Sequence, residues 1–294
     1  MNNGQYNNLI AQLDRLAKHN RQGSLLTKRR YYEAMQRFCR FLAENYHLQK
    51  LRNIRDEHFE EYILSMKDSG KSASTVKTDI SAIRFFHDLM PDARYQLPRN
   101  AELKIKLERR KFGGVDRSWS DDEYARFCAA GAEAGHPEYA DAAALAYYAG
   151  LRIHECFRID TAMADKAIRS EHLIIKGKGG KVRTVHLRKE AIDALIRARA
   201  RVPRGEKLFV PHDEETHVSI AKLQQFIASN RETLADCNRE SRLTFHGLRH
   251  SYAEHLYTTL MKLGSSELDA RKAVSEALGH NRPDVTRIYL AGAM

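Results

Sequence analysis

Two basic side chains near the carboxyl end of the sequence have the types and spacing that acid–base chemistry beside a fixed charge requires. His246 and Arg249 lie three positions apart in the stretch Thr244-Phe245-His246-Gly247-Leu248-Arg249-His250. Residues three apart on a helix share one face. A histidine can act as a general acid or base, and an arginine supplies a permanent cation. The spacing therefore predicts that both side chains point at the same spot.

Another histidine and a tyrosine follow about thirty residues later. An apolar helical run ends at Leu278, and Gly279 after it is typical of a helix C-cap. Pro283 can occupy the first position of the next helix. His280 falls in the turn between these helices, and Tyr289 falls near the end of the second. Taken alone, Tyr289 is also compatible with an ordinary core aromatic.

A metal site is the first alternative for this group of histidines. His246 and His250 have the i, i+4 spacing that suits a zinc ion, and Glu254 and His255 follow. The sequence contains no His-Glu-x-x-His, and Arg249 stands between the two histidines. We therefore expect no metal. The four cysteines are scattered without a Cys-x-x-Cys pair and are most simply reduced core residues.

Two further basic residues stand at predicted element boundaries. Gly150 ends a helical pattern and Arg152 starts the next, where a pair with Glu155 would be a purely structural explanation. Lys178 lies in the Gly-rich turn 177–180 between two predicted strands, 173–175 and 182–187. The turn is not a phosphate-binding Walker loop, because it lacks that motif and joins two strands. Lysines at the tips of such turns are ordinarily exposed to solvent without a function, so Lys178 alone is weak evidence of a functional site.

Apolar periodicity predicts the elements that position these residues. Residues 1–92 carry four short amphipathic helical patterns, and residues 93–117 resemble a basic linker with Pro98 and Gly113-Gly114. Residues 118–294 are mostly helical with one small hairpin, and the apolar alternation continues along its second strand, 182–187. Ser120 and Glu123 predict a capping box at the start of this region, and a helix is predicted over 219–234. We expect a mainly α protein: an N-terminal four-helix domain, the linker, and a mixed but mostly helical second domain.

The distribution of charge indicates a polyanionic partner. Residues 1–112 hold 22 Lys and Arg against 13 Asp and Glu, a net charge of +9, whereas the rest of the chain carries +2. A basic first domain favours nucleic acid, although a solvated basic surface is the plain alternative. The candidate DNA-binding residues are Lys28, Arg29, Arg30, Lys71, Lys77, Arg109, Arg110 and Lys111. No apolar run is long enough to span a bilayer and no signal pattern begins the chain, so we expect a cytoplasmic protein and no membrane partner.

The order of these motifs is similar to that of a known family. From residue 118 onward the chain resembles the catalytic domain of tyrosine recombinases, the phage-integrase and Xer-like group. The resemblance rests on Gly150-Leu151-Arg152, Gly177-Lys178-Gly179, His246-Gly247-Leu248-Arg249-His250, Leu278-Gly279-His280 and Tyr289. It implies that the catalytic residues are Arg152, Lys178, His246, Arg249, His280 and, as nucleophile, Tyr289. The N-terminal domain is similar in pattern to the family's core-site DNA-binding domain.

This resemblance implies a site-specific DNA recombinase that cleaves and rejoins strands through a 3′-phosphotyrosyl intermediate, in the integration, excision or resolution of a DNA element. It implies double-stranded DNA with an inverted-repeat core site as partner, a homo-tetramer on that DNA, and neither ATP nor a metal cofactor. Glu155 would orient Arg152 or His246 from behind, with a surface ion pair as the alternative. We expect the protein to act on the bacterial nucleoid.

Two other functions remain open from the sequence. A type IB topoisomerase shares the chemistry without site exchange, and a DNA-binding regulator would bind without catalysis. Two departures from the family stand out: residues 261–267 look like a slightly longer connection, and only residues 290–294 follow Tyr289. Five residues with a central glycine cannot form an independent helix. We therefore expect a monomer in free solution that pairs only on DNA.

Overall fold

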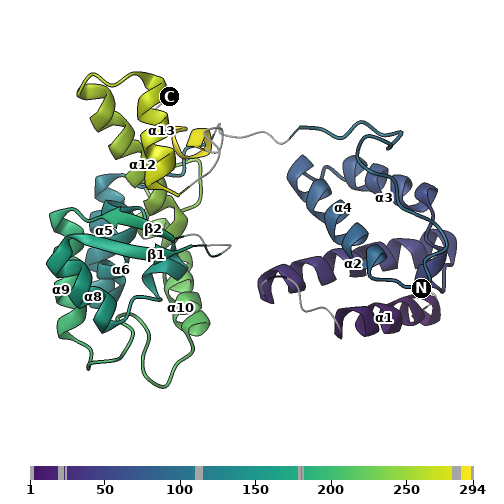
Figure 1. Ribbon diagram of the computed structural model, residues 1–294, viewed down its shortest axis with the longest axis horizontal. Coiled ribbons are helices and arrows are strands. Elements are labelled where there is room, and N and C mark those ends of the chain that lie inside the picture. Colours follow the sequence, from purple (N-terminus) through teal and green to yellow (C-terminus); the bar gives the residue numbers. More distant parts are fainter. Residues whose placement is uncertain are drawn as a thin grey trace. The chain divides into compact units, whose positions relative to one another are not determined.

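The computed structural model describes residues 3–18, 23, 25–109, 115–177, 180, 182–279 and 286–292. It divides into two units, Met1–Lys111 and Phe112–Met294, and each is considered by itself (Figure 1). Both units are built mainly from helices, as the sequence predicts.

The first unit is a bundle of four helices with one short 3-10 turn. Its elements are α1 (Asn3–Lys18), α2 (Leu25–Tyr46), η1 (Leu51–Asn53), α3 (Asp56–Asp68) and α4 (Ala73–Asp88). The Ser72 hydroxyl caps α4 by accepting a hydrogen bond from the Thr75 backbone N–H at 3.2 Å. The aromatic stripes of the sequence line the core, where Phe38, Phe59 and Phe86 are almost completely buried. Their helical spacing thus reflects packing within the bundle.

The segment after α4 continues to pack against this bundle. Leu97, Leu103, Ile105 and Leu107 are partly buried against its core. The Lys104 backbone N–H donates to a carboxylate oxygen of Glu60 at 2.9 Å. The predicted linker, residues 93–117, therefore starts as a chain segment attached to the first unit.

The second unit holds the remaining elements of the described ranges. They are α5 (Asp121–Glu133), α6 (Pro137–Ala149), α7 (Ile153–Cys156), α8 (Thr161–Ser170), β1 (His172–Lys176), β2 (Val182–His186), α9 (Lys189–Ala200), α10 (Thr216–Ser229), α11 (Arg231–Leu234), α12 (Phe245–Lys262), α13 (Glu267–Ala277) and η3 (Arg287–Tyr289). The capping box at Ser120 forms as predicted: its hydroxyl accepts from the Glu123 N–H, and the Glu123 carboxylate accepts from the Ser120 N–H. The helix predicted over 219–234 is interrupted at Asn230, which separates α10 from α11.

Strands β1 and β2 form the two-stranded antiparallel sheet found in the described part of the chain. His172 pairs with His186 at one end and Lys176 with Val182 at the other. Val182, Thr184 and His186 are exposed, whereas Val185 is buried. This alternation agrees with the sequence and puts Arg183 on the inner face of β2.

A second, smaller hydrophobic cluster in this unit is formed by residues of α12, α13 and η3. Tyr252, Tyr257, Leu278, Tyr289 and Leu290 belong to this second cluster. It is the packing that holds the predicted nucleophile in place. None of the helices in the described ranges is long and apolar enough to cross a membrane.

Candidate active site

The first turn of α12 places His246 and Arg249 because a glycine lets the helix approach a tryptophan closely. A Cβ atom on Gly247 would lie 2.4 Å from the Arg117 carbonyl and 2.6 Å from the Trp119 ring. The Trp119 ring N–H donates to the Thr244 carbonyl at 2.9 Å. A side chain at 247 would push this helix start out of position, which explains the glycine between His246 and Arg249.

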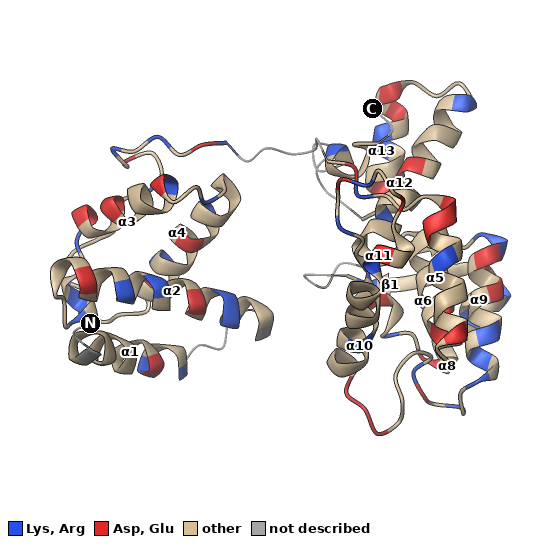
Figure 2. Ribbon diagram, turned by 180° about the vertical axis from the view of Figure 1, so that it is seen from behind, with Lys and Arg blue, Asp and Glu red and all other residues tan. Residues whose placement is uncertain are grey.

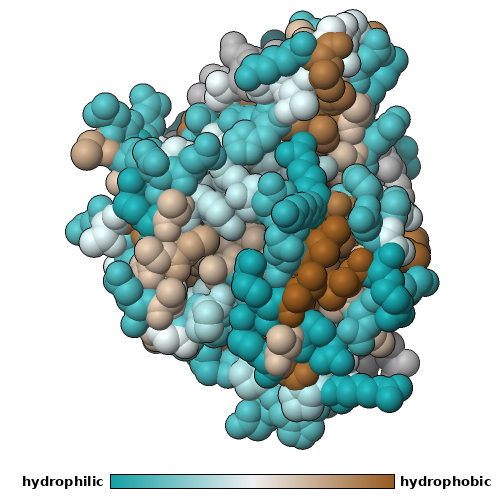
Figure 3. Space-filling model, turned by 90° about the vertical axis from the view of Figure 1, so that its left-hand side faces the viewer, coloured by the Kyte–Doolittle hydropathy of each residue, from teal (hydrophilic) through white to brown (hydrophobic). Residues whose placement is uncertain are grey.

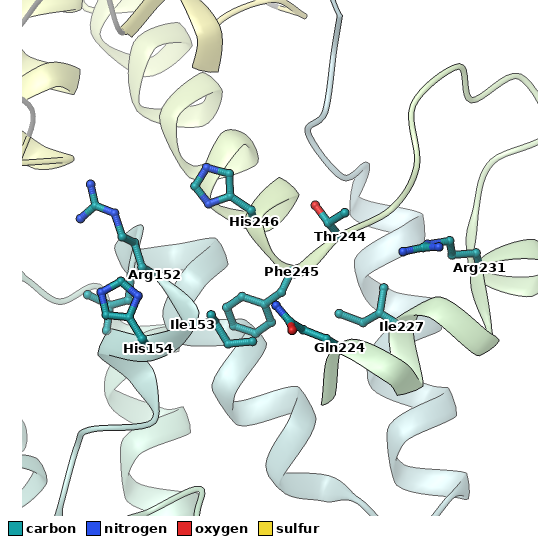
Figure 4. A pocket seen from close by; sticks show the side chains of 10 residues that line it. Arg152, Ile153, His154, Gln224, Ile227, Arg231, Thr244, Phe245 and His246 are labelled. Carbon is teal, nitrogen blue, oxygen red and sulfur yellow. The ribbon is translucent and has the colours of Figure 1, made fainter. Parts of the chain in front are cut away.

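Arg152 is held at the start of α7 by a second glycine. Gly150 ends α6 with a φ of +65°, and a Cβ atom there would lie 2.5 Å from the Tyr252 ring. The chain then turns sharply, and Arg152 occupies the N-cap position of α7. Its side chain is partly exposed. Figure 4 shows Arg152 and His246 extending from different elements toward the same side of a pocket of about 390 Å³.

Glu155 is the centre of the cluster. Its carboxylate is buried and accepts hydrogen bonds from the Arg152 backbone N–H at 2.8 Å and from Arg152 Nη1 at 3.0 Å. Arg183 binds both oxygens of the same carboxylate, at 2.8 and 2.9 Å. Burial alone would raise the pKa of Glu155, but the hydrogen bonds from Arg183 and Arg152 lower it to about 2. The carboxylate is therefore ionised throughout the physiological range.

Arg183 is a residue that the sequence reasoning missed. Its partner Glu155 lies 28 positions away, so no local spacing reveals the pair. The available signal was its position: Arg183 is two residues before the buried Val185 on β2, so a charged residue lies on the inward face of this strand. A cation among buried apolar positions needs a partner inside the protein.

Arg249 is completely buried behind this cluster. Its terminal nitrogens donate hydrogen bonds to the backbone carbonyls of Gly150 and Leu278. Its Nε is buried and has no hydrogen-bond partner among the described residues. Burial, and then the charge of Arg152, lower the pKa of Arg249 to about 10. The guanidinium still carries its proton at neutral pH.

Tyr289 contacts two of the three histidines of α12, His246 and His250. Its hydroxyl lies 3.2 Å from His246 Nε2. Its ring stacks on His250, with ring centroids 4.4 Å apart, and its centroid lies 5.8 Å from the Arg249 guanidinium carbon.

Both histidines are neutral at pH 7. One side of His246 is exposed, but the protein atoms crowding its other side, and then the charge of Arg249, lower its pKa to about 4. Burial is the main cause that lowers the pKa of His250 to about 3. A neutral His246 can accept the proton of a hydroxyl group.

Two of the six predicted catalytic residues, Lys178 and His280, lie outside the described residues, as do Arg110 and Lys111. The other four, Arg152, His246, Arg249 and Tyr289, come together around the cluster just described. Within the described ranges, no group of three or more His, Cys, Asp or Glu side chains is arranged to hold a metal ion.

The predicted DNA-binding residues of the first unit have mixed surroundings. Figure 2 shows Lys and Arg interspersed with Asp and Glu along α2. There Arg29 pairs with Glu33 at 2.9 Å and Arg30 with the buried Asp79 at 3.4 Å. Lys28 is partly exposed, and Arg109 is exposed. Lys71 and Lys77 line one small pocket together with Lys67, a concentration of positive charge that suits phosphate.

Family models match both units of the chain. The model described as the phage integrase family matches residues 120–294. The model described as the phage integrase N-terminal SAM-like domain matches residues 10–91.

Full-length relatives are similar over almost the whole chain. A tyrosine recombinase of Thermosipho africanus (strain TCF52B) is 28% identical over 280 residues, covering 92% of this chain and 90% of the relative. The tyrosine recombinase XerC of Shewanella oneidensis (strain ATCC 700550) is 23% identical over 299 residues, covering 95% and 87%.

Solved structures show the same fold. A lambda integrase dimer bound to a COC′ core site superposes with a TM-score of 0.67 at 18% identity, covering 96% of this chain and 76% of that one. The XerH site-specific recombinase bound to palindromic difH substrate gives 0.62 at 21% identity, covering 95% and 80%.

Proposed function

The chain belongs to the phage integrase family, and we propose that it is a site-specific DNA recombinase that cleaves and rejoins strands through a 3′-phosphotyrosyl intermediate. The observation that supports this most is the group formed by the Tyr289 hydroxyl, His246 Nε2 at 3.2 Å and the Arg249 guanidinium beside the tyrosine ring. A hydroxyl, a neutral base and a buried cation are the parts that phosphoryl transfer to a side chain requires.

Tyr289 is the nucleophile in this proposal. Its oxygen attacks the phosphorus atom, and His246 accepts the phenolic proton. The bond from phosphorus to the 5′ oxygen breaks, which leaves the 3′ end joined to the tyrosine. Because one phosphoester replaces another, the bond energy is kept for religation, and no ATP is consumed.

Arg152 and Arg249 stabilise the charge that develops on the non-bridging oxygens. Arg152 reaches into the pocket from the start of α7, and the buried Arg249 contributes its charge from beside the Tyr289 ring. One carboxylate, that of Glu155, is surrounded by three guanidinium groups, those of Arg152, Arg183 and Arg249. Together these four groups carry a net charge of +2. An anion in the pocket offsets that excess.

The resemblance to the family assigns the two remaining roles, to Lys178 and His280. Lys178 protonates the departing 5′ oxygen, and His280 donates a hydrogen bond to the phosphate. An acid at the leaving group is needed because an alkoxide leaves poorly without a proton.

We propose double-stranded DNA with two inverted half-sites as the substrate. The lambda integrase and XerH structures contain core-site and difH DNA. The net charge of +9 in residues 1–112 supports phosphate contacts by the first unit. Because its relatives include bacterial proteins, we place the reaction in the bacterial cytoplasm, on the nucleoid.

Assembly on DNA is the second part of the proposal. A lambda integrase structure is a tetramer bound to a Holliday junction, and we propose a homo-tetramer on DNA here. Figure 3 shows apolar patches on an otherwise hydrophilic face. Among the exposed apolar residues, Met261, Leu263 and Leu268 lie around the turn between α12 and α13. This is a small contact area, so we expect a monomer in free solution that pairs when DNA raises its local concentration.

Capture of the covalent intermediate tests the function. The probe is a pool of duplexes from the DNA flanking the gene, supplemented with randomised cores and nicked at many different positions so that some nicks fall near the cleavage point. We expect a protein–DNA adduct that survives denaturation and forms in EDTA without ATP. Sequencing the recovered strands identifies the core site.

Two results would contradict this function. Failure of the wild-type protein to form any adduct with the pool would remove the recombinase assignment. Relaxation of a supercoiled plasmid that lacks the recovered site would instead indicate a topoisomerase. Light scattering with and without a two-half-site duplex tests the assembly, and a stable oligomer without DNA would contradict it.

A further inference from the structure

Arg183 makes the most specific contact in the cluster, yet none of the proposed catalytic steps uses it. Its two terminal nitrogens bind the two oxygens of Glu155 at 2.8 and 2.9 Å, a bidentate geometry that fixes both groups. Only 13% of its side chain is exposed. Such burial means that the pair is not a solvated surface bridge.

Glu155 has other cations within reach. Arg152 Nη1 lies 3.0 Å from Oε1, and Arg249 Nη1 lies 4.0 Å from Oε2. A small movement would bring Arg249 into direct contact with Oε2. In the structure that oxygen is occupied by Arg183 Nη2 and by the Arg152 backbone N–H. Arg183 therefore competes with Arg249 for the same carboxylate.

The stem of Arg183 also fixes the turn after α13. A Cβ atom on Gly279 would lie 2.9 Å from Arg183 Cδ, and Gly279 has a φ of +67°. The side chain thus fills the space under the residue that precedes His280. Arg183 stands five positions after Lys178 in the sequence. One side chain connects β2 with Glu155 of α7 and with the end of α13.

We infer that Arg183 is a positioning residue: it shares the Glu155 carboxylate with Arg152 and keeps Arg249 off it, so that both arginines stay oriented toward the scissile phosphate. This inference rests on the proposed function. Without Arg183, Glu155 draws the guanidinium groups toward itself, and their donors turn away from the phosphate. Misplacement of a catalytic group by about 1 Å can cost about a hundredfold in rate.

The test measures single-turnover cleavage of the recovered duplex at saturating protein. Arg183→Met keeps the length of the stem beside Gly279 and removes the charge. We expect cleavage to slow about 10- to 100-fold, with the dissociation constant for DNA within about threefold of wild type. The double variant Arg183→Met/Glu155→Gln should be at least about fivefold faster than Arg183→Met alone, because a neutral amide captures the arginines far less strongly.

This rescue separates positioning from plain stability. Because Glu155→Gln also removes a buried charge that has lost a partner, cleavage is measured at a temperature at which Trp119 fluorescence shows both variants to be folded. A role in stability alone then predicts equal cleavage by the single and double variants. Arg183→Lys serves if the Met variant fails to fold, and it should be intermediate since an ammonium group lacks the planar fork that binds both oxygens. Its double variant with Glu155→Gln carries the same rescue test.

Arg201→Met is the matched control. Arg201 binds the buried Asp141, which Arg197 also holds, and neither arginine lines the proposed site. The Arg201→Met variant should cleave DNA at the wild-type rate. Cleavage by Arg183→Met within threefold of wild type would overturn the inference, and so would a double variant no faster than the single one. Absence of an adduct from the wild-type protein would instead reject the proposed function.

Discussion

Two buried carboxylates in the second unit are held by arginines, and they differ in how many elements converge on them. Asp141 on α6 binds Arg197 and Arg201, which both come from α9 or its end. Glu155 on α7 binds Arg152 before the same helix and Arg183 on β2, with Arg249 of α12 at 4.0 Å. The first cluster fastens one pair of neighbouring helices, whereas the second joins three separate parts of the unit.

Exposure and charge separate the two clusters further. The side chains of Arg197 and Arg201 are 56% and 35% exposed, so solvent screens their charge. Those of Arg152 and Arg249 are 24% and 0% exposed. Excess positive charge is screened by solvent at the first cluster and retained by burial at the second. A buried excess of cations is a better indication of an anion site than an arginine–carboxylate pair as such.

The largest expected effect is loss of the covalent adduct in Tyr289→Phe. The hydroxyl is the proposed nucleophile, while the ring, which is buried against His250, is retained by phenylalanine. We expect no adduct on a denaturing gel and DNA affinity within a few-fold of wild type. A shifted band from the Phe variant would reject the assignment and would leave the Glu155 cluster without its nucleophile.

Lys178→Ala should have the next largest effect. Loss of a general acid slows cleavage by about two to four orders of magnitude. Replacing the bridging 5′ oxygen by sulfur should restore much of the rate, because a thiolate leaves without a proton. The matched control is Lys181→Ala, three positions later in the sequence. Rescue by sulfur of that variant, and not of Lys178→Ala, would transfer the role to Lys181.

Acid should weaken the second unit through the histidines under the active site. The pKa of His250 is about 3 because it is buried, against an ordinary value of 6.5. The unfolded chain takes up a proton below pH 6.5 that the folded chain refuses, so stability present above pH 6.5 falls as the pH drops toward 3.

His250→Phe preserves a ring against Tyr289 and removes this titration. Between pH 7 and pH 4, the difference in unfolding free energy between wild type and variant should change by on the order of 3 kcal/mol. Trp119 is the single tryptophan, is buried and packs at the start of α12, so its fluorescence reports this unit. Parallel pH profiles for the two proteins would contradict the buried neutral His250.

Local patterns predicted the elements and the residues that have local partners. The capping box at Ser120 and the alternation along β2 depend on neighbours in the sequence, and both form as expected. Leu103, Ile105 and Leu107 pack on the first unit at alternate positions, yet the described residues 93–109 form no strand. The alternation alone does not reveal which surface these side chains pack against.

The contacts that shape the site depend on distant parts of the chain. Gly247 is a glycine because of Trp119, 128 positions before it, and Arg183 is buried because of Glu155. In the sequence, neither Gly247 nor Arg183 shows a local pattern that would reveal its distant partner. The break at Asn230 was missed for another reason: the apolar period continues across it, with Leu223 and Ile227 of α10 and Leu234 of α11 all buried.

The smallest effect is expected at the Asp141 cluster, and it tests whether the comparison is sound. Arg201→Met leaves Asp141 with Arg197, so the carboxylate keeps a partner. Because Arg201 is 35% exposed, solvent discounts the loss, and we expect unfolding free energy to fall by only about 1 kcal/mol. Cleavage should stay within about twofold of wild type, because α6 and α9 remain packed. If Arg201→Met instead slowed cleavage as much as Arg183→Met does, both clusters would act through general stiffness of the unit. The special position of Glu155, with three arginines around it, would then explain nothing about strand cleavage.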